Sequence, residues 1–360
     1  MFGSILTLTV ILLHLYVFGR GLPAPRRNGR IPPLYLICVC VLPLALFLVG
    51  RGFHHRSAGV GPWLADFATY WTATVFILAV STLAVDLATG FGCFIKGRAA
   101  TRKSLTMVLG AGLCIFALIQ GFRAPVIREH EVPLAGLPKE LDGKTLAVLS
   151  DLHLGSVLGA KWMAARAAQV EALKPDMVVL LGDNVEGHAQ PDPSLLAALR
   201  RLSAPMGVYA VMGNHERFRS RDMPRLEDMG FTVLKDSWAT AAPGLTIAGL
   251  DYVRGDGVER IPKAVAGRPA GALIMLEHMP EHAREIAAAG AGLMLAGHTH
   301  GGQIWPFNYM VQRRFPFIDG RYAVDGMPLI VSRGTGLWGA RMRLWRPGEI
   351  LKIVLRRRDA

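Results

Sequence analysis

Apolar residues fill the first third of the chain in long runs, whereas the rest alternates short apolar runs with polar segments. The long apolar stretches lie near residues 2–19, 33–50, 67–92 and 104–122. Each is close to the roughly 20 residues that a helix needs to cross the hydrocarbon layer of a membrane. The pattern predicts about four transmembrane helices in residues 1–122, followed by a separate domain in residues 123–360.

Short apolar runs in the second part have the length of buried strands, and they lie at 145–149, 177–181, 207–211, 273–276 and 293–295. Segments 161–173 and 193–202 lie between the first three of these runs and have the spacing of amphipathic helices. Alternating strands and helices are typical of packed sheets flanked by helices. We therefore expect an α/β fold with a single core in this part of the chain.

Basic residues are concentrated in two of the loops that separate the apolar stretches. The first of these loops carries Arg20, Arg26, Arg27 and Arg30, and the loop before the fourth stretch carries Lys96, Arg98, Arg102 and Lys103. The loop before the third stretch has only Arg51 and Arg56. Basic loops remain cytoplasmic, so the N-terminus and the second domain are predicted on the outer side of the membrane. An error of one in the number of spans would reverse this topology.

The formal net charge of +13 does not by itself indicate a nucleic-acid partner, because much of the excess lies in loops that flank the membrane. The second domain shows no nucleic-acid-binding motif. All four cysteines fall in or beside the apolar stretches, at Cys38, Cys40, Cys93 and Cys114. The second domain therefore has neither a thiol nucleophile nor a disulfide.

Side chains that bind metals or transfer protons occur in five short motifs, each directly after a predicted strand. They are Asp151 and His153 in Ser-Asp-Leu-His, Asp183 in Gly-Asp, Asn214 and His215 in Gly-Asn-His-Glu, His278 in Glu-His, and His298 and His300 in Gly-His-Thr-His. Carboxylates, imidazoles and an amide suit two divalent ions of manganese, iron, zinc or cobalt. Two such ions, about 3.5–4 Å apart, share a hydroxide that attacks a phosphorus ester.

The local sequence around these motifs predicts how the ligands are presented. Asp151 and His153 lie two residues apart, so on an extended segment both would project to one side and chelate one ion. Gly182 and Gly213 each precede a candidate ligand, and a residue without Cβ lets the backbone turn tightly there. The five motifs in this order indicate a metal site much more specifically than any one of them alone.

The series of motifs resembles the calcineurin-like metallophosphoesterase superfamily, and in particular its bacterial membrane-anchored branch. The resemblance covers about residues 131–355 and includes Leu137-Pro138 and the segment from Val331 to Gly334. It implies a metal-dependent phosphoesterase with a β-sandwich flanked by helices, in the bacterial inner membrane with its catalytic domain on the periplasmic side. It also implies one ion on Asp151, His153, Asp183 and His300, and a second on Asp183, Asn214, His278 and His298.

The resemblance further implies that His215 contacts the phosphate and protonates the leaving oxygen. A histidine outside the ligand set can carry the proton that a metal-bound one must lose. The competing interpretation makes His215 a ligand and His278 structural. Glu186 stands where the family commonly has aspartate, which leaves the fine positioning of Asn214 or His215 open but not the metal site itself. Other candidate supporting residues are Glu216, Glu277, Gln303 and His188.

Aromatic residues and arginines alternate in segments 304–315 and 338–345. Such a composition suits a membrane interface, where rings lie at headgroup depth and guanidinium groups pair with phosphates. We expect the substrate to be a phosphodiester, monoester or pyrophosphate of a lipid or another envelope component. The alternative is that these aromatics pack in the core of their own domain. Two other functions stay open, a non-catalytic metal-dependent membrane sensor or scaffold, and a nuclease.

Overall fold

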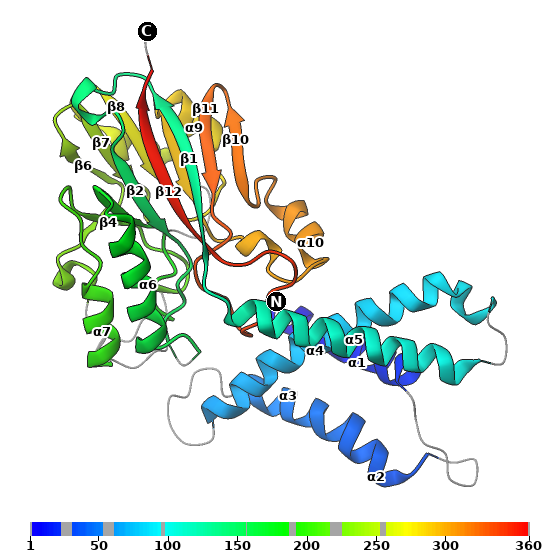
Figure 1. Ribbon diagram of the computed structural model, residues 1–360. Coiled ribbons are helices and arrows are strands. Elements are labelled where there is room, and N and C mark those ends of the chain that lie inside the picture. The colour runs from blue at the N-terminus through cyan, green and yellow to red at the C-terminus, as the bar shows by residue number, and fades with distance from the viewer. Residues whose placement is uncertain are drawn as a thin grey trace. The chain divides into compact units, whose positions relative to one another are not determined.

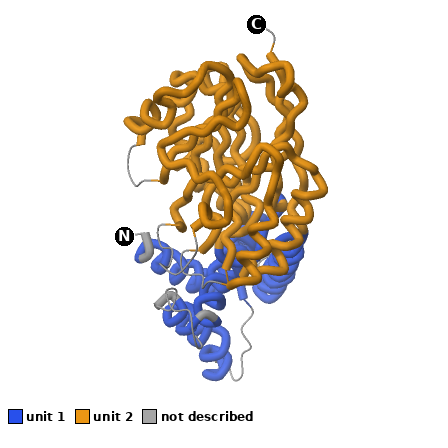
Figure 2. The backbone as a smooth tube through the Cα atoms, turned by 90° about the vertical axis from the view of Figure 1, so that its left-hand side faces the viewer, with its two compact units in different colours: residues 1–123, 339–346 blue, residues 124–338, 347–360 orange. Residues whose placement is uncertain are grey.

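The computed structural model describes residues 2–22, 31–52, 61–94, 98–155, 157–186, 192–216, 225–252 and 257–358. The chain forms two compact units, which Figure 2 shows in different colours. Residues 1–123 and 339–346 make up the helical unit, and residues 124–338 and 347–360 make up the sheet unit. The segment 339–346 therefore belongs to the helical unit although it lies far from the helices in the sequence.

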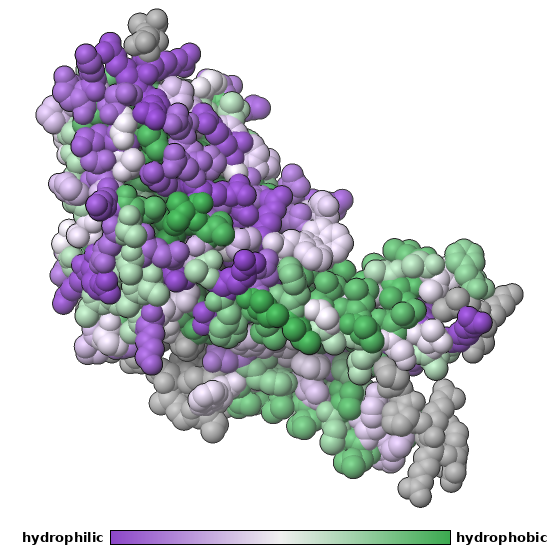
Figure 3. Space-filling view, in the orientation of Figure 1, coloured by the Kyte–Doolittle hydropathy of each residue, from purple (hydrophilic) through white to green (hydrophobic). Residues whose placement is uncertain are grey.

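The helical unit contains four helices long and apolar enough to cross a membrane, over Ser4–Gly21, Pro33–Gly50, Trp63–Ala88 and Ala99–Phe122. This confirms the predicted spans. The helical elements are α1 (Phe2–Tyr16), η1 (Val17–Gly21), α2 (Pro33–Tyr35), η2 (Leu36–Val41), α3 (Leu42–Gly52), α4 (Gly61–Ala88), η3 (Gly90–Gly92) and α5 (Ala99–Phe122). Hydrophobic residues cover much of the visible face of this unit in Figure 3. Leu12 is 57% exposed and Val108 is 73% exposed, as expected for side chains that face lipid.

A buried carboxylate joins three of these helices. Asp86, near the end of α4, is only 1% exposed. It accepts hydrogen bonds from Nε of Arg20 at 2.5 Å, from Nη1 of Arg102 at 2.6 Å and from the hydroxyl of Tyr16 at 3.0 Å. The acid in the third span therefore makes contacts inside the bundle, as a charge in a membrane requires.

Segment 339–346 packs on the last turns of α5. The backbone N–H of Arg343 donates to the carbonyl of Ala117 at 2.9 Å, and Nε2 of Gln120 donates to the carbonyl of Trp345 at 3.0 Å. The guanidinium of Arg341 lies 4.0 Å from the ring centroid of Phe122. Arg343 is 1% exposed, so its guanidinium does not face the surroundings.

The sheet unit is built on two six-stranded sheets (Figure 1). One sheet contains, in order, β1 (Val126–Leu134), β12 (Glu349–Arg357), β2 (Thr145–Leu149), β3 (Met177–Leu180), β4 (Val208–Ala210) and β5 (Thr232–Val233). The other contains β10 (Gly320–Val324), β11 (Met327–Val331), β9 (Leu293–Ala296), β8 (Ala272–Leu276), β7 (Leu245–Gly249) and β6 (Ser237–Ala242).

Side chains from both sheets form a shared core between them, with Val148, Val179, Ile274 and Leu295 among its members. Helices cover the outer faces. The α helices of this unit are α6 (Ala160–Leu173), α7 (Pro193–Arg200), α8 (Ile261–Val265), α9 (Ala283–Ala288) and α10 (Phe307–Arg314), and its 3₁₀ turns are η4 (Lys139–Leu141), η6 (Glu227–Met229), η7 (Val258–Arg260) and η8 (His300–Gly302). The predicted helix-flanked β-sandwich is confirmed.

The central strands are buried on both faces, which explains why they read as continuous apolar runs. Strands β2, β3 and β4 are parallel neighbours in one sheet, and β7, β8 and β9 are parallel neighbours in the other. Parallel strands bring their carboxyl ends to the same edge, where open α/β folds place their sites. The five motifs follow β2, β3, β4, β8 and β9.

Candidate metal centre

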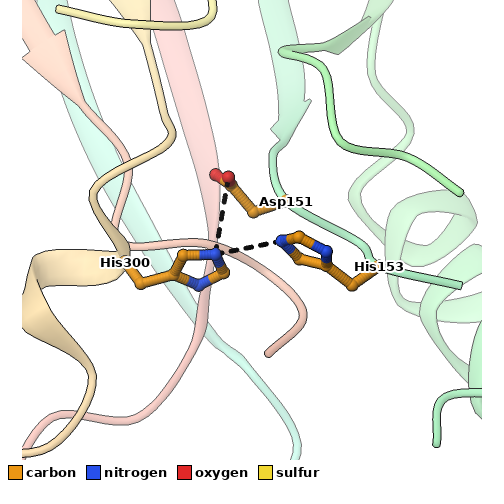
Figure 4. Close-up of side chains that lie close together, drawn as sticks. All are labelled: Asp151, His153 and His300. Atoms are coloured by element: carbon orange, nitrogen blue, oxygen red, sulfur yellow. Dashed lines mark hydrogen bonds and ion pairs between the residues drawn. The ribbon is translucent and has the colours of Figure 1, made fainter. Parts of the chain in front are cut away.

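The first group of candidate ligands comes from the loops after β2 and β9 (Figure 4). Nε2 of His300 lies 3.6 Å from Oδ1 of Asp151 and 3.1 Å from Nε2 of His153. These three residues are buried, and their donor atoms all lie within 4.8 Å of one another. Such an arrangement of one carboxylate and two imidazole nitrogens suits a divalent ion.

The second group comes from the loops after β3, β4, β8 and β9. Nε2 of His278 lies 3.3 Å from Oδ2 of Asp183, 3.2 Å from Oδ1 of Asn214 and 3.2 Å from Nδ1 of His298. One imidazole nitrogen thus meets a carboxylate, an amide oxygen and another imidazole. The amide of Asn214 completes a mixed set of oxygen and nitrogen donors.

Asp183 lies between the two groups. Its Oδ2 is 3.8 Å from Nε2 of His153 in the first group and 3.3 Å from Nε2 of His278 in the second. Its Oδ1 accepts the backbone N–H of His215 at 2.8 Å. The structure therefore brings all seven sequence-predicted ligands into one connected cluster.

The ligand backbones are not extended, so the expectation of an extended Asp151-His153 segment is wrong. Positive φ angles occur at Asp151 (52°), His153 (45°), Asp183 (50°), His298 (72°) and His300 (50°). Residues with a Cβ in this left-handed region cost of order 1–3 kcal/mol each and are concentrated at functional sites. Each loop turns sharply as it leaves its strand, which directs the side chain toward the cluster.

Three glycines allow these loops to approach one another. A Cβ on Gly182, whose φ is +87°, would lie 2.7 Å from Nδ1 of His278. A Cβ on Gly213 would lie 2.2 Å from Oδ1 of Asp183. A Cβ on Gly297 would clash with the hydroxyl of Ser150. The glycines in the motifs are therefore required by close packing around the candidate ligands.

The hydrogen bonds of two histidines leave one nitrogen of each ring facing the cluster. His278 has its Nδ1 2.7 Å from the carbonyl of Leu181, and His153 has its Nδ1 2.7 Å from Oε1 of Glu186. A carbonyl or carboxylate partner requires Nδ1 to carry a proton, so Nε2 is the nitrogen that can coordinate a metal ion once the ring is neutral. The donor set therefore fits divalent metal ions, and the imidazoles of His153 and His278 are each oriented by a partner on the side away from the cluster.

The two buried carboxylates have opposite electrostatic environments. Burial opposes ionisation of Asp183, but the charges of His278 and His153 and a hydrogen bond from His278 hold its pKa well below its usual range. Burial raises the pKa of Asp151, and the charge of Asp183 raises it further. Two buried carboxylates whose charges repel resist ionising together, and cations bound between them relieve that repulsion.

The pKa values of His298 and His278 are also shifted in opposite directions. Burial lowers the pKa of His298 to about 3, with the charge of His278 acting in the same direction. For His278 burial acts against the charged form, but Asp183 and Asp151 outweigh it and raise the pKa to about 10. His298 is thus ready to coordinate as a neutral ring, whereas His278 must release a proton to coordinate.

Glu186 joins His153 to His215. Its Oε1 lies 2.7 Å from Nδ1 of His153, and its Oε2 lies 2.9 Å from Nδ1 of His215. Burial of His215 disfavours its charged form, but the hydrogen bond and charge of Glu186 raise its pKa to about 9. The longer acid at this position reaches both rings, so it takes the orienting role that the sequence left open.

Other predicted supporting residues divide into two kinds. Glu216 is 8% exposed and accepts backbone N–H groups of Gly213, Asp183 and Asn184, which fixes the turns that carry the ligands. Glu277 is bonded instead to His282, and Gln303 to the backbone of Trp338. His188 lies outside the described residues.

Two sets of hydrogen bonds near Asp151 were not predicted from the sequence. The hydroxyl of Ser150 donates to Oδ2 of Asp151, and the backbone N–H groups of Thr335 and Gly336 donate to the carbonyls of Ser150 and Asp151 at 2.7 and 3.1 Å. The hydrogen bond from the Ser150 hydroxyl could have been predicted, because Ser150 directly precedes the candidate ligand Asp151 in the sequence. The contacts from Thr335 and Gly336 are distant in sequence and carried no local signal.

Comparisons with known proteins agree with this geometry. A family model described as calcineurin-like phosphoesterase matches residues 144–302. An uncharacterized metallophosphoesterase of Aquifex aeolicus is 30% identical, with the match covering 64% of this chain and 91% of that protein. An uncharacterized metallophosphoesterase of Campylobacter jejuni is 27% identical over 89% of this chain and 88% of its own length.

A transmembrane protein with a metallophosphoesterase domain from Danio rerio is 29% identical, and the match covers 70% of this chain. This chain spans 62% of the length of that relative, and 63% of the length of the similarly named protein from Bos taurus. The ordered ligand motifs, the sandwich and these matches lead to one conclusion: this chain belongs to the calcineurin-like phosphoesterase family.

Proposed function

We propose that this chain is a membrane-anchored phosphohydrolase that uses two divalent metal ions to cleave a phosphoester or pyrophosphate of a lipid or another envelope component. The observation that carries the proposal is the position of Asp183 between two groups of metal-binding side chains. A shared carboxylate between two such groups is the arrangement that a two-metal hydrolase needs.

Each ion has its own ligands in this proposal, and Asp183 belongs to both sets. One ion is held by Asp151, His153, Asp183 and His300, and the other by Asp183, Asn214, His278 and His298. When bound, two divalent ions supply a hydroxide at neutral pH and neutralise the charge of the phosphoryl oxygens. Manganese, iron, zinc and cobalt all suit this donor set.

His215 is the proton donor in the proposal. It lies beside Asp183 through its backbone N–H, and its raised pKa keeps its ring protonated near neutral pH. Glu186 holds Nδ1 of His215, which leaves Nε2 to contact the substrate phosphate and to protonate the departing oxygen. His278 has its ring among the ligands, and this favours it over His215 as the second-site ligand.

Four candidate spans and a short connection support a substrate located at the membrane. Helix α5 ends at Phe122 and strand β1 begins at Val126, so three residues join the last span to the sheet unit. The contacts of Asp86 with Arg20 and Arg102 bring the two basic loops to one end of the bundle. By the positive-inside rule this end is cytoplasmic, which supports an outer location of the catalytic unit at the bacterial cell membrane.

The test is hydrolysis of chromogenic phosphodiesters and monoesters by full-length protein, stripped with chelator and reloaded with single metals. Asp183→Asn should lower the bound metal below two ions per chain and abolish turnover. His215→Ala should retain both ions and lower kcat by about 10²–10⁴-fold. Asp192→Asn, in the exposed cap of α7, is the control and should change neither quantity.

Metal-restored turnover that both active-centre substitutions remove would support the hydrolase. Two bound ions without turnover of soluble esters or lipid phosphoesters would instead support the non-catalytic sensor. Retention of two ions by Asp183→Asn would contradict its shared-ligand role.

A further inference from the structure

Helix α10 and the loop before it expose an unusual concentration of large apolar side chains on the sheet unit. Trp305 is 40% exposed, Phe307 is 41%, Tyr309 is 59% and Met310 is 63%. The alternative that these aromatics pack in the core of their domain is therefore wrong for Trp305, Phe307 and Tyr309. We call the four residues the α10 surface. Exposing such side chains to water has a cost, and contiguous apolar patches mark interaction sites.

Basic residues end the same helix. Arg313 and Arg314 lie in the last turn of α10. Arg314 pairs with Glu281 at 2.5 Å and lies 4.8 Å from the ring centroid of Phe315. Arg313 is exposed, and within the described part of the chain no carboxylate pairs with it. The aromatic rings of the α10 surface thus share a helix with a guanidinium, that of Arg313, which is available to an external anion.

The α10 surface is directly connected to the metal centre. Phe315, the residue after α10, meets His298 edge to face with ring centroids 5.1 Å apart. Gly302 lies so close to the first turn of α10 that a Cβ there would be 2.3 Å from Cα of Asn308. Whatever docks on the α10 surface therefore lies beside two segments that carry candidate ligands.

The chain also connects the α10 surface to a membrane-spanning helix. The amide side chain of Gln303, two residues before Trp305, bonds to the backbone carbonyl and N–H of Trp338 at 2.9 and 3.0 Å. Trp338 is followed directly by segment 339–346, which packs on the end of α5. That end has the composition of a membrane interface, since Phe122 is 60% exposed and Trp345 is 49% exposed.

We propose that the α10 surface docks on the headgroup layer of the membrane that the chain's own helices span. Its aromatic side chains lie at the level of the headgroups, and Arg313 pairs with the phosphates of anionic phospholipids. A bilayer fits better than a folded partner protein because the patch is on a short helix whose arginines border its aromatics. In addition, Gln303, just before the patch, bonds to Trp338, which directly precedes segment 339–346. The docked helix brings lipid phosphate to the edge of the metal centre.

The experiment measures docking without turnover. The four cysteines of the full chain are replaced by alanine, a fluorophore is attached to Met310→Cys, and the protein is reconstituted in vesicles of phosphatidylglycerol and phosphatidylcholine. Phospholipids with a nitroxide on the headgroup quench the fluorophore only at short range. The matched control is Ala197→Cys, which is exposed on α7 of the same unit.

We expect quenching at position 310 to exceed quenching at position 197 by at least about threefold, because only the α10 surface enters the headgroup layer. Arg313→Glu should lower the quenching at position 310 about twofold in vesicles that contain phosphatidylglycerol. Arg200→Glu, an equal charge reversal on exposed α7, should leave it unchanged. Thermal unfolding of each variant verifies that the fold is retained.

Equal quenching at the two positions would overturn the proposal, as would an equal effect of the two charge reversals. Quenching at position 310 that persists in vesicles alone but is lost when a soluble protein fraction is added would assign the surface to a protein partner instead. Because the readout needs no hydrolysis, a failed docking result and a failed phosphohydrolase assay are independent of each other.

Discussion

Oε2 of Glu186 lies 2.9 Å from Nδ1 of His215, while the other oxygen of the same carboxylate lies 2.7 Å from Nδ1 of His153. One side chain thus orients both a candidate metal ligand and the candidate proton donor. Metal binding by His153 and proton donation by His215 therefore depend on the same side chain, because any movement of Glu186 shifts both rings.

Replacing this carboxylate tests the joint role. Glu186→Gln keeps the length of the side chain but removes its charge and offers a donor to rings that need an acceptor. We expect kcat to fall by about 10–100-fold and metal affinity to fall by a similar factor. Steady-state kinetics and metal titration of the full chain measure both. Glu171→Gln, a control at an exposed position on α6, should change neither kcat nor metal affinity. An unchanged metal affinity in Glu186→Gln would contradict the proposal that Glu186 orients His153.

The close approach at Gly182 predicts a loss of metal binding on adding one methyl group. Gly182→Ala would place Cβ 2.7 Å from Nδ1 of His278 and also strain a φ of +87°. Gly267→Ala is the matched control, since its φ is +68° and nothing lies within 4 Å of its Cβ. Both variants should lose about 1–2 kcal/mol from the left-handed backbone. Only Gly182→Ala should also lose bound metal, measured by elemental analysis of the purified protein.

The packing of segment 339–346 on α5 depends on a second glycine. A Cβ on Gly121 would lie 2.2 Å from the carbonyl oxygen of Arg341, whereas a Cβ on Gly112 of the same helix meets nothing within 4 Å. Gly121→Ala should therefore speed hydrogen exchange in segment 339–346 by at least about tenfold, which corresponds to about 1.4 kcal/mol. Gly112→Ala should leave that exchange rate unchanged. Equal rates in the two variants would show that the segment does not need this contact.

The partly buried His130 on β1 predicts a dependence of stability on pH. Burial lowers its pKa below 6.5, and the charges of Arg128 and Arg321 act in the same direction. The unfolded chain then binds more protons than the folded one near and below pH 6.5, so stability is complete above that pH and falls as the pH decreases. The slope contributed by this one group is at most about 1.4 kcal/mol per pH unit.

Thermal unfolding of the full chain between pH 5 and pH 8 measures this contribution by comparison with His130→Gln. The variant should lose stability less steeply between about pH 6.5 and pH 5 than the unsubstituted chain, because it lacks the group that charges on unfolding. Parallel curves for the two proteins would contradict a lowered pKa of His130.

Local sequence was sufficient to predict the spans, the strands and the candidate ligands. Uninterrupted apolar length sets the spans, because a helix in lipid must satisfy its backbone internally over the whole hydrocarbon layer. Short apolar runs mark β2, β3, β8 and β9 because both faces of these strands are buried. The motif residues stand next to these runs, so their place at strand ends was already visible.

Three features were decided only by tertiary structure, because each depends on contacts between residues far apart in the chain. The left-handed backbone at Asp151 and His153 arises where the loop after β2 meets the loops of other strands, and no local sequence pattern predicted it. Glu186 acquired its role when folding placed two rings at its oxygens. Segment 339–346 packs with helices more than 200 residues earlier in the sequence, which only the folded chain brings within reach.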